Sequence, residues 1–173
     1  MFKKLKLDEL GRQDLESFKK SDKNNIILIL DNVRSMHNVG SIFRTADGFG
    51  IKKIYLCGIT AKPPHREIHK TALGAENSID WQYYENPSEV INKLKSQGVK
   101  IIAIEQAEGS VPLNNFIYDE ENPIAIILGN EVEGVSNEAM NMADSCVEIP
   151  QFGTKHSFNV SVCTGIVLWQ LLG

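Results

Sequence analysis

Three polar segments of this chain carry residue types that bind ligands and stabilise charge. They span residues 31–44, 129–136 and 150–161, and each contains glycine beside charged or small polar side chains. The residues before them, such as 124–128, form apolar, β-branched runs that are typical of buried strands. Ligands of parallel sheets bind beyond the carboxyl ends of the strands, so we expect the three segments to meet in one site.

The first segment places an amide at Asn38 and a guanidinium six residues later at Arg44. An asparagine near a helix start can simply cap the helix by accepting hydrogen bonds from free backbone N–H groups. A surface arginine can simply pair with a carboxylate. A guanidinium fork can also hold a phosphate or stabilise a developing alkoxide. By itself, this segment leaves the structural and the catalytic interpretations open.

The second segment is an acidic loop between Gly129 and Gly134, with Glu131 and Glu133 inside it. A glycine at the end of a strand lets the backbone approach a ligand closely. The loop has no lysine and adds negative charge, so it favours a cationic or hydroxyl-rich ligand over a phosphate. The alternative is an ordinary strand–turn–helix connection, with the helix starting near Ser136.

The third segment is a long loop in front of an apolar helix, and it carries Ser157, Asn159 and Ser161. A loop of this length between short elements is more often functional than idle. The structural alternative is that Ser157 or Asn159 caps the helix that follows.

Other patterns that carry chemistry are incomplete. His65 and His69 have the spacing of a helical zinc pair, but Arg66 stands where the zinc-protease pattern needs glutamate, so we expect no metal site. A Gly-rich Lys-Ser/Thr loop and a complete dinucleotide glycine pattern are both missing from the sequence. ATP and NAD are therefore not the expected ligands.

Strands and helices alternate along the chain, which predicts an α/β fold with a mostly parallel sheet flanked by helices. Neither a linker nor a repeat divides it, so we expect one domain over residues 26–173 after a short helical extension over residues 1–25. The predicted strands are residues 26–30, 54–57, 101–104, 124–128 and 147–149, and the predicted helices of the domain are residues 39–49, 88–96 and 159–172.

The charge of the chain is strongly asymmetric, although its net value is only −4. Residues 1–70 hold 14 lysines and arginines against 8 acidic residues, whereas residues 71–173 hold 4 against 14. A local basic surface suits contact with phosphates, and solvated lysines around a helix are the alternative. The basic side chains of the N-terminal segment that we expect at phosphates are Lys3, Lys4, Lys6, Arg12, Lys19 and Lys20.

Three cysteines, Cys57, Cys146 and Cys163, lie in apolar stretches without paired spacing. This usage predicts reduced thiols in a cytoplasmic protein. The longest apolar runs are too short to span a bilayer, and the first residues do not have the pattern of a secretory signal. We therefore expect no membrane partner.

Taken together and in this order, the three segments resemble the motifs of the SpoU–TrmH branch of the SPOUT methyltransferases. The matching residues are Asn38, Gly40 and Arg44 in the first motif, Gly129, Glu131 and Gly134 in the second, and Ile149, Pro150 and residues 157–161 in the third. Phe158 stands where this family usually has leucine. Three motifs in the right order are far more specific than any one of them.

The resemblance implies a deep trefoil knot in the C-terminal part, with S-adenosylmethionine (SAM) bound bent within the knot. It implies transfer of a methyl group to a ribose 2′-hydroxyl of RNA, with tRNA as the first choice of substrate and rRNA as the second. It also implies a homodimer with the site near the interface. The last helix is apolar, and its candidates for this interface are Val162, Ile166, Val167 and Trp169; the alternative is that these residues fill the core of the monomer, as some of them must. A knotted module that binds RNA or cofactor without catalysis is the alternative.

The resemblance also assigns roles to residues by their position in the motifs. The cofactor-binding residues would be Ile104, Glu105, Gly129, Ile149, Ser157 and Phe158. Arg44 would be essential for catalysis, with Asn38, Ser157 and Asn159 orienting the arginine and the ribose, and with Glu131 holding the loop or the arginine. A free guanidinium is a poor base at neutral pH because its pKa exceeds about 12. Stabilising the alkoxide is physically the easier role.

Overall fold

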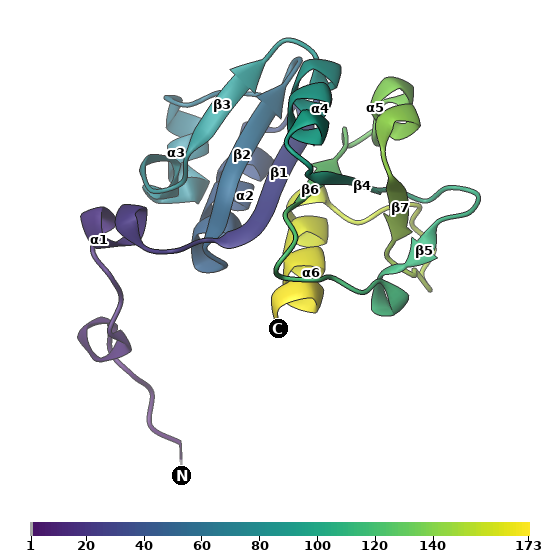
Figure 1. The fold of residues 1–173 in the computed structure, drawn as a ribbon. Helices are drawn as coiled ribbons and strands as arrows, with labels where there is room; N and C mark the ends of the chain where they lie inside the picture. Colours follow the sequence, from purple (N-terminus) through teal and green to yellow (C-terminus); the bar gives the residue numbers. More distant parts are fainter. Residues whose placement is uncertain (1) are drawn as a thin grey trace.

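The computed structural model describes residues 2–173, in which seven strands form one sheet (Figure 1). The strand order is β3-β2-β1-β6-β4-β7-β5, and all six pairings are parallel. This confirms the predicted α/β fold with a parallel sheet. The strands are β1 (Asn24–Asp31), β2 (Ile51–Cys57), β3 (Trp81–Tyr84), β4 (Lys100–Ile104), β5 (Val111–Pro112), β6 (Ile124–Leu128) and β7 (Ser145–Glu148).

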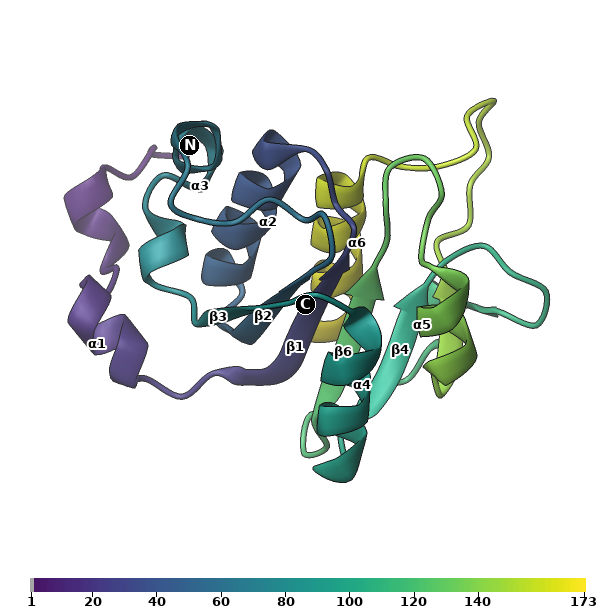
Figure 2. The ribbon, with the colours of Figure 1, turned by 90° about the horizontal axis from the view of Figure 1, so that it is seen from above.

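Helices cover both faces of the sheet. Seen from above in Figure 2, α2, α3 and α6 lie on one face, and α4 and α5 lie on the other. The helices are α1 (Leu15–Lys20), α2 (Met36–Gly48), α3 (Arg66–Ala72), α4 (Pro87–Ser96), α5 (Asn137–Met142) and α6 (Val160–Leu172), with short 3₁₀ turns η1 (Leu7–Leu10), η2 (Ala75–Asn77) and η3 (Leu113–Asn115). No helix among the described residues has the length and apolar character needed to cross a membrane.

The two central strands, β1 and β6, are apolar on both sides because both faces of the sheet are covered. Ile26, Leu28 and Leu30 of β1 belong to the core under α2 and α6, whereas Ile27 and Ile29 belong to the core under α4 and α5. None of these five side chains is more than 6% exposed. Burying each of them stabilises the fold by roughly 1.5–3 kcal/mol, which makes the centre of the sheet the most strongly specified part of the chain.

The N-terminal segment extends away from the body of the sheet in Figure 1. It contains η1 and α1, two short helices where the sequence predicted one. Asp14 starts α1 by accepting a 2.8 Å hydrogen bond from the Ser17 amide. The segment then leads into β1 at Asn24.

Helices α2 and α3 approach each other most closely at Gly40. A Cβ atom at this position would lie 2.1 Å from Thr71 Oγ1 and 2.3 Å from the Ile68 carbonyl oxygen. Thr71 Oγ1 also donates a 3.0 Å hydrogen bond to the His37 carbonyl oxygen. The glycine of the first motif is therefore a packing residue that lets α3 lie beside the start of α2.

We expect Gly40→Ala to lower the free energy of unfolding by about 1–3 kcal/mol, because the added methyl group meets the backbone of α3. Gly48→Ala in the same helix is the matched control, since no atom lies within 4 Å of a Cβ there. That exchange should be neutral or stabilise the protein by up to about 1 kcal/mol. Urea unfolding of both variants measures the difference, and equal stabilities would contradict the packing role of Gly40.

Candidate functional site

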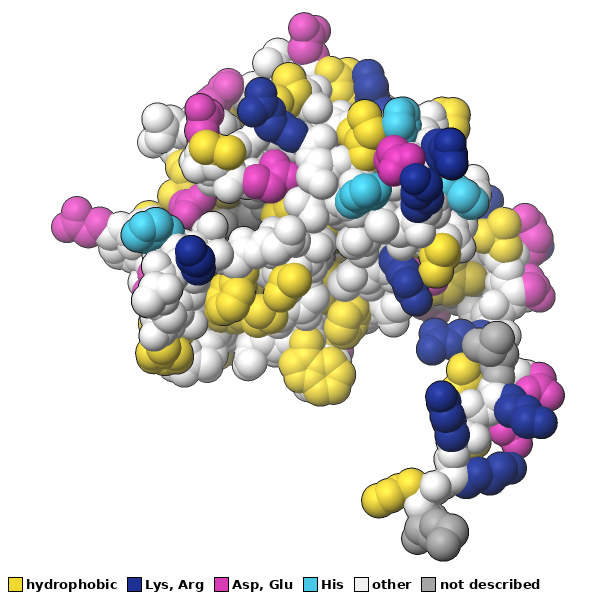
Figure 3. All heavy atoms as spheres, turned by 180° about the vertical axis from the view of Figure 1, so that it is seen from behind, with side chains coloured by type: hydrophobic (Ala, Val, Ile, Leu, Met, Phe, Trp, Pro, Cys, Tyr) yellow, Lys and Arg dark blue, Asp and Glu magenta, His cyan; other side chains and the backbone are white. Residues whose placement is uncertain are grey.

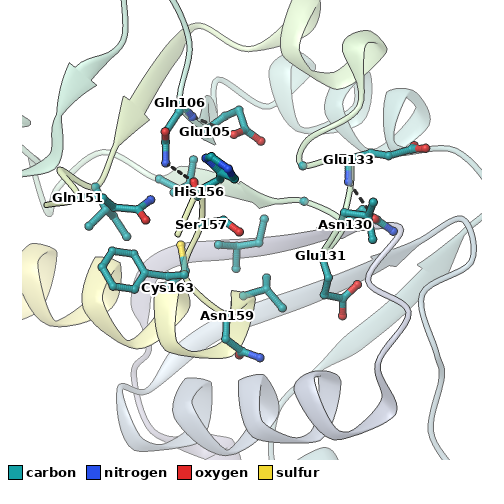
Figure 4. A pocket seen from close by; sticks show the side chains of 18 residues that line it. Glu105, Gln106, Asn130, Glu131, Glu133, Gln151, His156, Ser157, Asn159 and Cys163 are labelled. Atoms are coloured by element: carbon teal, nitrogen blue, oxygen red, sulfur yellow. Dashed lines mark hydrogen bonds between the residues drawn. The ribbon is translucent and has the colours of Figure 1, made fainter. Parts of the chain in front are cut away.

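A cavity of about 380 Å³ opens at the carboxyl ends of β4 and β6 (Figure 4). Three loops surround it, namely the loop after β4, the loop 129–136 after β6 and the loop before α6. The residues predicted to bind a cofactor all line this cavity: Ile104, Glu105, Gly129, Ile149, Ser157 and Phe158. Glu131 and Asn159, predicted as catalytic residues, line it as well. The fold thus brings together segments that lie far apart in the sequence.

The loop after β6 closes tightly on itself. Asn130 and Gly134 exchange two backbone hydrogen bonds of 2.8 and 3.0 Å. A Cβ atom on Gly129 would lie 2.1 Å from the carbonyl carbon of Gly134 and 2.2 Å from the Val135 nitrogen. Gly134 itself adopts a φ of +70°, which favours glycine. Both glycines of the second motif are therefore needed by the backbone geometry of the cavity wall.

Two carboxylates hold this loop in place from neighbouring strands. Glu105, after β4, accepts a 2.9 Å hydrogen bond from the Val135 amide. Asp31, at the end of β1, accepts a 2.8 Å bond from the Ser136 amide and is fully buried. The role of Asp31 was not predicted; the signal that could have revealed it is a single charged residue at the end of an apolar strand.

Glu131 connects the three segments. Its carboxylate accepts hydrogen bonds from the Arg34 amide at 3.2 Å, the Ser35 amide at 3.1 Å and Asn38 Nδ2 at 3.0 Å. Asn38 Oδ1 in turn accepts a 3.1 Å bond from Asn159 Nδ2. One polar chain therefore runs from the loop after β6, through the start of α2, to the start of α6.

The helix-cap alternatives are resolved by these contacts. Ser35, and not Asn38, caps α2. The side chain of Asn38 instead forms hydrogen bonds with Glu131 and Asn159. Asn159 does cap α6, because its Oδ1 accepts a 2.9 Å hydrogen bond from the Ser161 amide. Ser157 lies on the wall of the cavity with its neighbours His156 and Phe158.

The charge of Glu131 is favoured by its partners. Burial alone would raise the pKa of this carboxyl, but the hydrogen bonds from Asn38 and from the backbone amides outweigh burial and hold the pKa below its ordinary value. When folding lowers the pKa of a carboxyl group, its charge stabilises the folded protein at pH values above the pKa of the unfolded state. This stabilisation is lost as the pH falls through the pKa of the folded state.

We therefore expect the stability of the wild-type protein to fall below pH 4.5, the ordinary value for this carboxyl, in part because Glu131 becomes protonated. Glu131→Gln cannot gain this proton, so its melting temperature should decrease less between pH 5 and pH 3 than that of the wild type. Thermal unfolding across this range measures the effect. An identical acid-dependent decrease in both proteins would contradict the assigned hydrogen bonds.

Arg44 does not lie at this cavity. Six residues of α-helix advance about 9 Å and turn about 240°, so Arg44 points to a different side of α2 from Asn38. Arg44 is exposed and lines a second groove, of about 810 Å³, between α2, the η2 region and the N-terminal segment. The described residues contain no hydrogen bond or ion pair that joins Arg44 to Asn38, Glu131, Ser157 or Asn159. Within one chain, the predicted guanidinium and the predicted pocket are thus separate.

The two histidines with zinc-like spacing have other partners. His65 Nδ1 accepts a hydrogen bond from the Glu67 amide and caps α3, while His69 Nδ1 lies 2.5 Å from a carboxylate oxygen of Glu76. Within residues 2–173 there is no group of three histidine, cysteine or acidic side chains arranged to hold a metal ion. Cys163 lines the cavity, but burial raises the pKa of its thiol to about 12, which keeps it uncharged.

Residues 25–169 match the SpoU rRNA Methylase family. The chain belongs to this family. Its relatives include tRNA (guanosine(18)-2'-O)-methyltransferases from Aquifex aeolicus (strain VF5) and Borreliella burgdorferi. The Aquifex protein is 33% identical over 84% of this chain and 68% of its own length, and the Borreliella protein is 31% identical over 86% and 66%. The chain thus spans about two thirds of the length of these relatives.

Solved structures of the family have the same architecture. The A. aeolicus TrmH/SpoU tRNA modifying enzyme has a TM-score of 0.80 and 29% identity, covering 90% of this chain and 78% of that one. An AdoMet-bound rRNA methyltransferase from Sinorhizobium meliloti has a TM-score of 0.80 and 30% identity, covering 88% and 58%. The predicted membership of the SpoU–TrmH group is confirmed.

Proposed function

We propose that this chain transfers a methyl group from SAM to a ribose 2′-hydroxyl of RNA, and that tRNA is its substrate in preference to rRNA. The observation that carries the proposal is the cavity at which the second and third motif segments meet, with the first motif joined to it through Asn38. The names of the relatives support this reaction and this choice of RNA.

The cavity suits SAM in size and in chemistry. Its volume lies within the range of about 300–1,000 Å³ that is common for small-molecule sites. Apolar side chains such as Ile104, Ile149 and Phe158 offer a surface for a flat base, while Glu131 and Glu133 provide negative charge for a cationic ligand. Bound SAM supplies an electrophilic methyl group.

The chain's own residues then position the acceptor. The polar chain from Glu131 through Asn38 to Asn159 fixes the edge of the cavity, so that its free donors and acceptors can orient a ribose. A guanidinium facing the 2′-oxygen stabilises the alkoxide that forms as the hydroxyl proton leaves for solvent. We assign this role to Arg44 and a cofactor-contacting role to Ser157.

We propose a homodimer in which Arg44 reaches the cavity of the other copy. The exposed side of α6 is apolar, with Val162 52% and Trp169 68% exposed, and Phe158 in the loop before it is 41% exposed. Figure 3 shows hydrophobic side chains gathered at the centre of this face. Val167, also expected at the interface, is only 1% exposed and packs in the monomer's own core. Light scattering tests the dimer, and the mass of a single chain at micromolar concentration would contradict it.

We also propose the trefoil knot for residues 124–172, within the 26–173 domain. Helices α5 and α6 lie on opposite faces of the sheet, so the chain between them must cross the carboxyl edge of the sheet (Figure 2). The crossing residues and the loop after β6 line the same cavity, as expected if one passes through the other. A crystal structure in which this crossing runs outside the loop would contradict the knot. A tRNA substrate and three free cysteines support a cytoplasmic location.

The test is methyl transfer from labelled SAM to unmodified tRNA transcripts and to unmodified rRNA, followed by nucleoside analysis for 2′-O-methylation. Calorimetry with SAM, ATP and NAD runs in parallel. We expect binding of SAM alone and methylation of tRNA. Failure to bind SAM would overturn the proposal, and SAM binding without transfer to either RNA would instead support the knotted module that has lost catalysis.

A further inference from the structure

The loop after β6 is held at both ends by the carboxyl end of β1. Near its start, Asn130 Nδ2 donates a 2.7 Å hydrogen bond to the Asn32 carbonyl oxygen. At its end, the Ser136 amide donates a 2.8 Å bond to the carboxylate of Asp31. Asp31 is the last residue of β1, and Asn32 follows it directly. We call these two contacts the β1 clamp. It acts from outside the cavity, because neither Asp31 nor Asn32 is among the described residues that line it.

The β1 clamp is rigid because hydrogen bonds fix both ends of the Asn32 side chain. This residue adopts a φ of +58°, a left-handed conformation that asparagine tolerates better than most residues. Its Nδ2 donates a 2.8 Å bond to Asp31 Oδ1, and its Oδ1 accepts a 3.1 Å bond from the Ile59 amide. Thr60, next in the loop after β2, is buried and donates a 3.0 Å bond to the Leu30 carbonyl oxygen. The carbonyl oxygen of the clamp therefore has a fixed position.

Asn130 connects the clamp to the tip of the loop. Its Nδ2 bonds to Asn32, whereas its Oδ1 accepts hydrogen bonds from the Val132 amide at 2.8 Å and the Glu133 amide at 3.1 Å. A dashed line in Figure 4 marks the contact of Asn130 with the tip. Apolar burial does not hold the tip, since Val132 is 82% exposed. The position of the tip thus depends on hydrogen bonds, and one side chain makes three of them.

The tip needs this restraint because it concentrates negative charge. Glu131 and Glu133 lie two residues apart in it, and the Glu105 carboxylate contacts the same loop at the Val135 amide. Like charges repel each other and favour an open loop until a cationic ligand binds. A loop that closes only on binding lowers the affinity by the free energy of closing, whereas a loop that is already closed does not.

We propose that Asn130 is a positioning residue that holds the acidic loop in its closed form before SAM binds; this rests on the proposed function. A single carboxamide offers the donor that the β1 clamp needs and the acceptor that the tip needs, which a carboxylate cannot do. Asn130 acts on cofactor affinity and not on the transfer step, because bound SAM itself keeps the loop closed. The observed affinity is the intrinsic affinity multiplied by the fraction of protein whose loop is closed.

The test compares Asn130→Asp and Asn130→Ala with the control Asn122→Asp. Aspartate at position 130 keeps the acceptor for the tip and loses the donor to the clamp, while alanine loses both. Asn122 also donates through its Nδ2, at 2.6 Å to Asp119, but it lies before β6, at the amino edge of the sheet. Its exchange therefore loses the same donor and adds the same charge away from the cavity. Calorimetry with SAM, the kcat and KM of methyl transfer, and amide hydrogen exchange of the cofactor-free proteins are measured.

We expect SAM to bind roughly 10-fold more weakly to Asn130→Asp, as for one lost hydrogen bond, and more weakly still to Asn130→Ala. The negative charge of aspartate would by itself favour a cation, so charge does not account for such a loss. KM for SAM should rise in parallel, while kcat at saturating SAM stays within about twofold. The amides of Ser35 and Gly134 bond to Glu131 and to the Asn130 carbonyl oxygen in the closed loop. Without cofactor they should exchange about 10-fold faster in both variants, and the control should resemble the wild type.

Wild-type affinity in both Asn130 variants overturns the inference. Weaker binding with unchanged amide exchange also overturns it, because Asn130 would then contact SAM directly and not position the loop. A lower kcat at an unchanged KM indicates a general loss of structure and likewise contradicts the positioning role. A wild-type protein that does not bind SAM overturns the proposed function instead.

Discussion

Arg44→Ala should lose at least about 10²–10³-fold in methyl transfer while binding SAM as tightly as the wild type. The physical reason is that the guanidinium stabilises charge that appears only as the ribose hydroxyl is deprotonated. The residue is exposed and lies outside the cofactor cavity, so its removal should not disturb the fold or the cavity wall. Labelled methyl transfer and calorimetry with SAM measure the two quantities side by side.

Arg44→Lys is the informative companion, because it keeps the positive charge and removes the planar fork. Partial recovery would mean that charge supplies most of the effect, and no recovery would mean that two-pronged geometry does. Full turnover in Arg44→Ala would remove this residue from the mechanism. Loss of SAM affinity in parallel with turnover would contradict the separation of Arg44 from the cavity.

The same variant decides which copy supplies the guanidinium. A heterodimer pairs one Arg44→Ala chain with one chain in which Gly129→Ala distorts the cavity wall and weakens cofactor binding. If Arg44 acts in the other copy's cavity, one of the two sites combines an intact cavity with an intact arginine, and turnover should return. If Arg44 acts within its own chain, each site carries one lesion and the heterodimer stays inactive. The second result would contradict the proposed arrangement.

The centre of the sheet could be predicted from the sequence because the local apolar pattern of its strands and their burial in the tertiary fold favour the same structure. The strand predicted over 124–128 is observed with the same bounds, since every residue in it is buried and apolar. Edge elements lack this agreement. Strand β3 is half-buried and aromatic, and α3 has only seven residues, fewer than an isolated helix needs. The packing of α3 on Gly40 stabilises it, and that contact is invisible in a local pattern.

The sequence predicted which segments form the site, but it did not predict the hydrogen bonds that join these segments. Ordered motifs predicted that the loops around Gly129 and Phe158 would meet, and both line one cavity. The hydrogen bonds from Glu131 to the turn before α2 join residues nearly a hundred positions apart, which only the tertiary fold brings together. The direction of Arg44 depends on the rotation of a helix against its neighbours, and the role that we propose for Arg44 depends on a second chain. Neither can be derived from the spacing of residues alone.

Gly129→Ala should weaken SAM binding by roughly 100-fold or more, a loss of about 2.7 kcal/mol. The new methyl group would lie 2.1–2.4 Å from backbone atoms of Gly134 and Val135, which cannot rotate away. The loop must therefore open, and it loses the paired hydrogen bonds between Asn130 and Gly134 that shape the cavity wall. Calorimetry with SAM measures the affinity, and thermal unfolding should show a loss of about 1–3 kcal/mol in stability.

Gly153→Ala is the matched control, because Gly153 lies in the loop before α6 and no atom lies within 4 Å of a Cβ there. It should bind SAM as the wild type does. Equal SAM affinities in the two variants would show that the loop after β6 can open without loss of binding free energy. They would also show that cofactor binding does not require the closed form of this loop. A loss confined to Gly129→Ala would instead mean that cofactor affinity depends on backbone geometry at the end of β6, which explains why glycine is required where the strand meets the cavity.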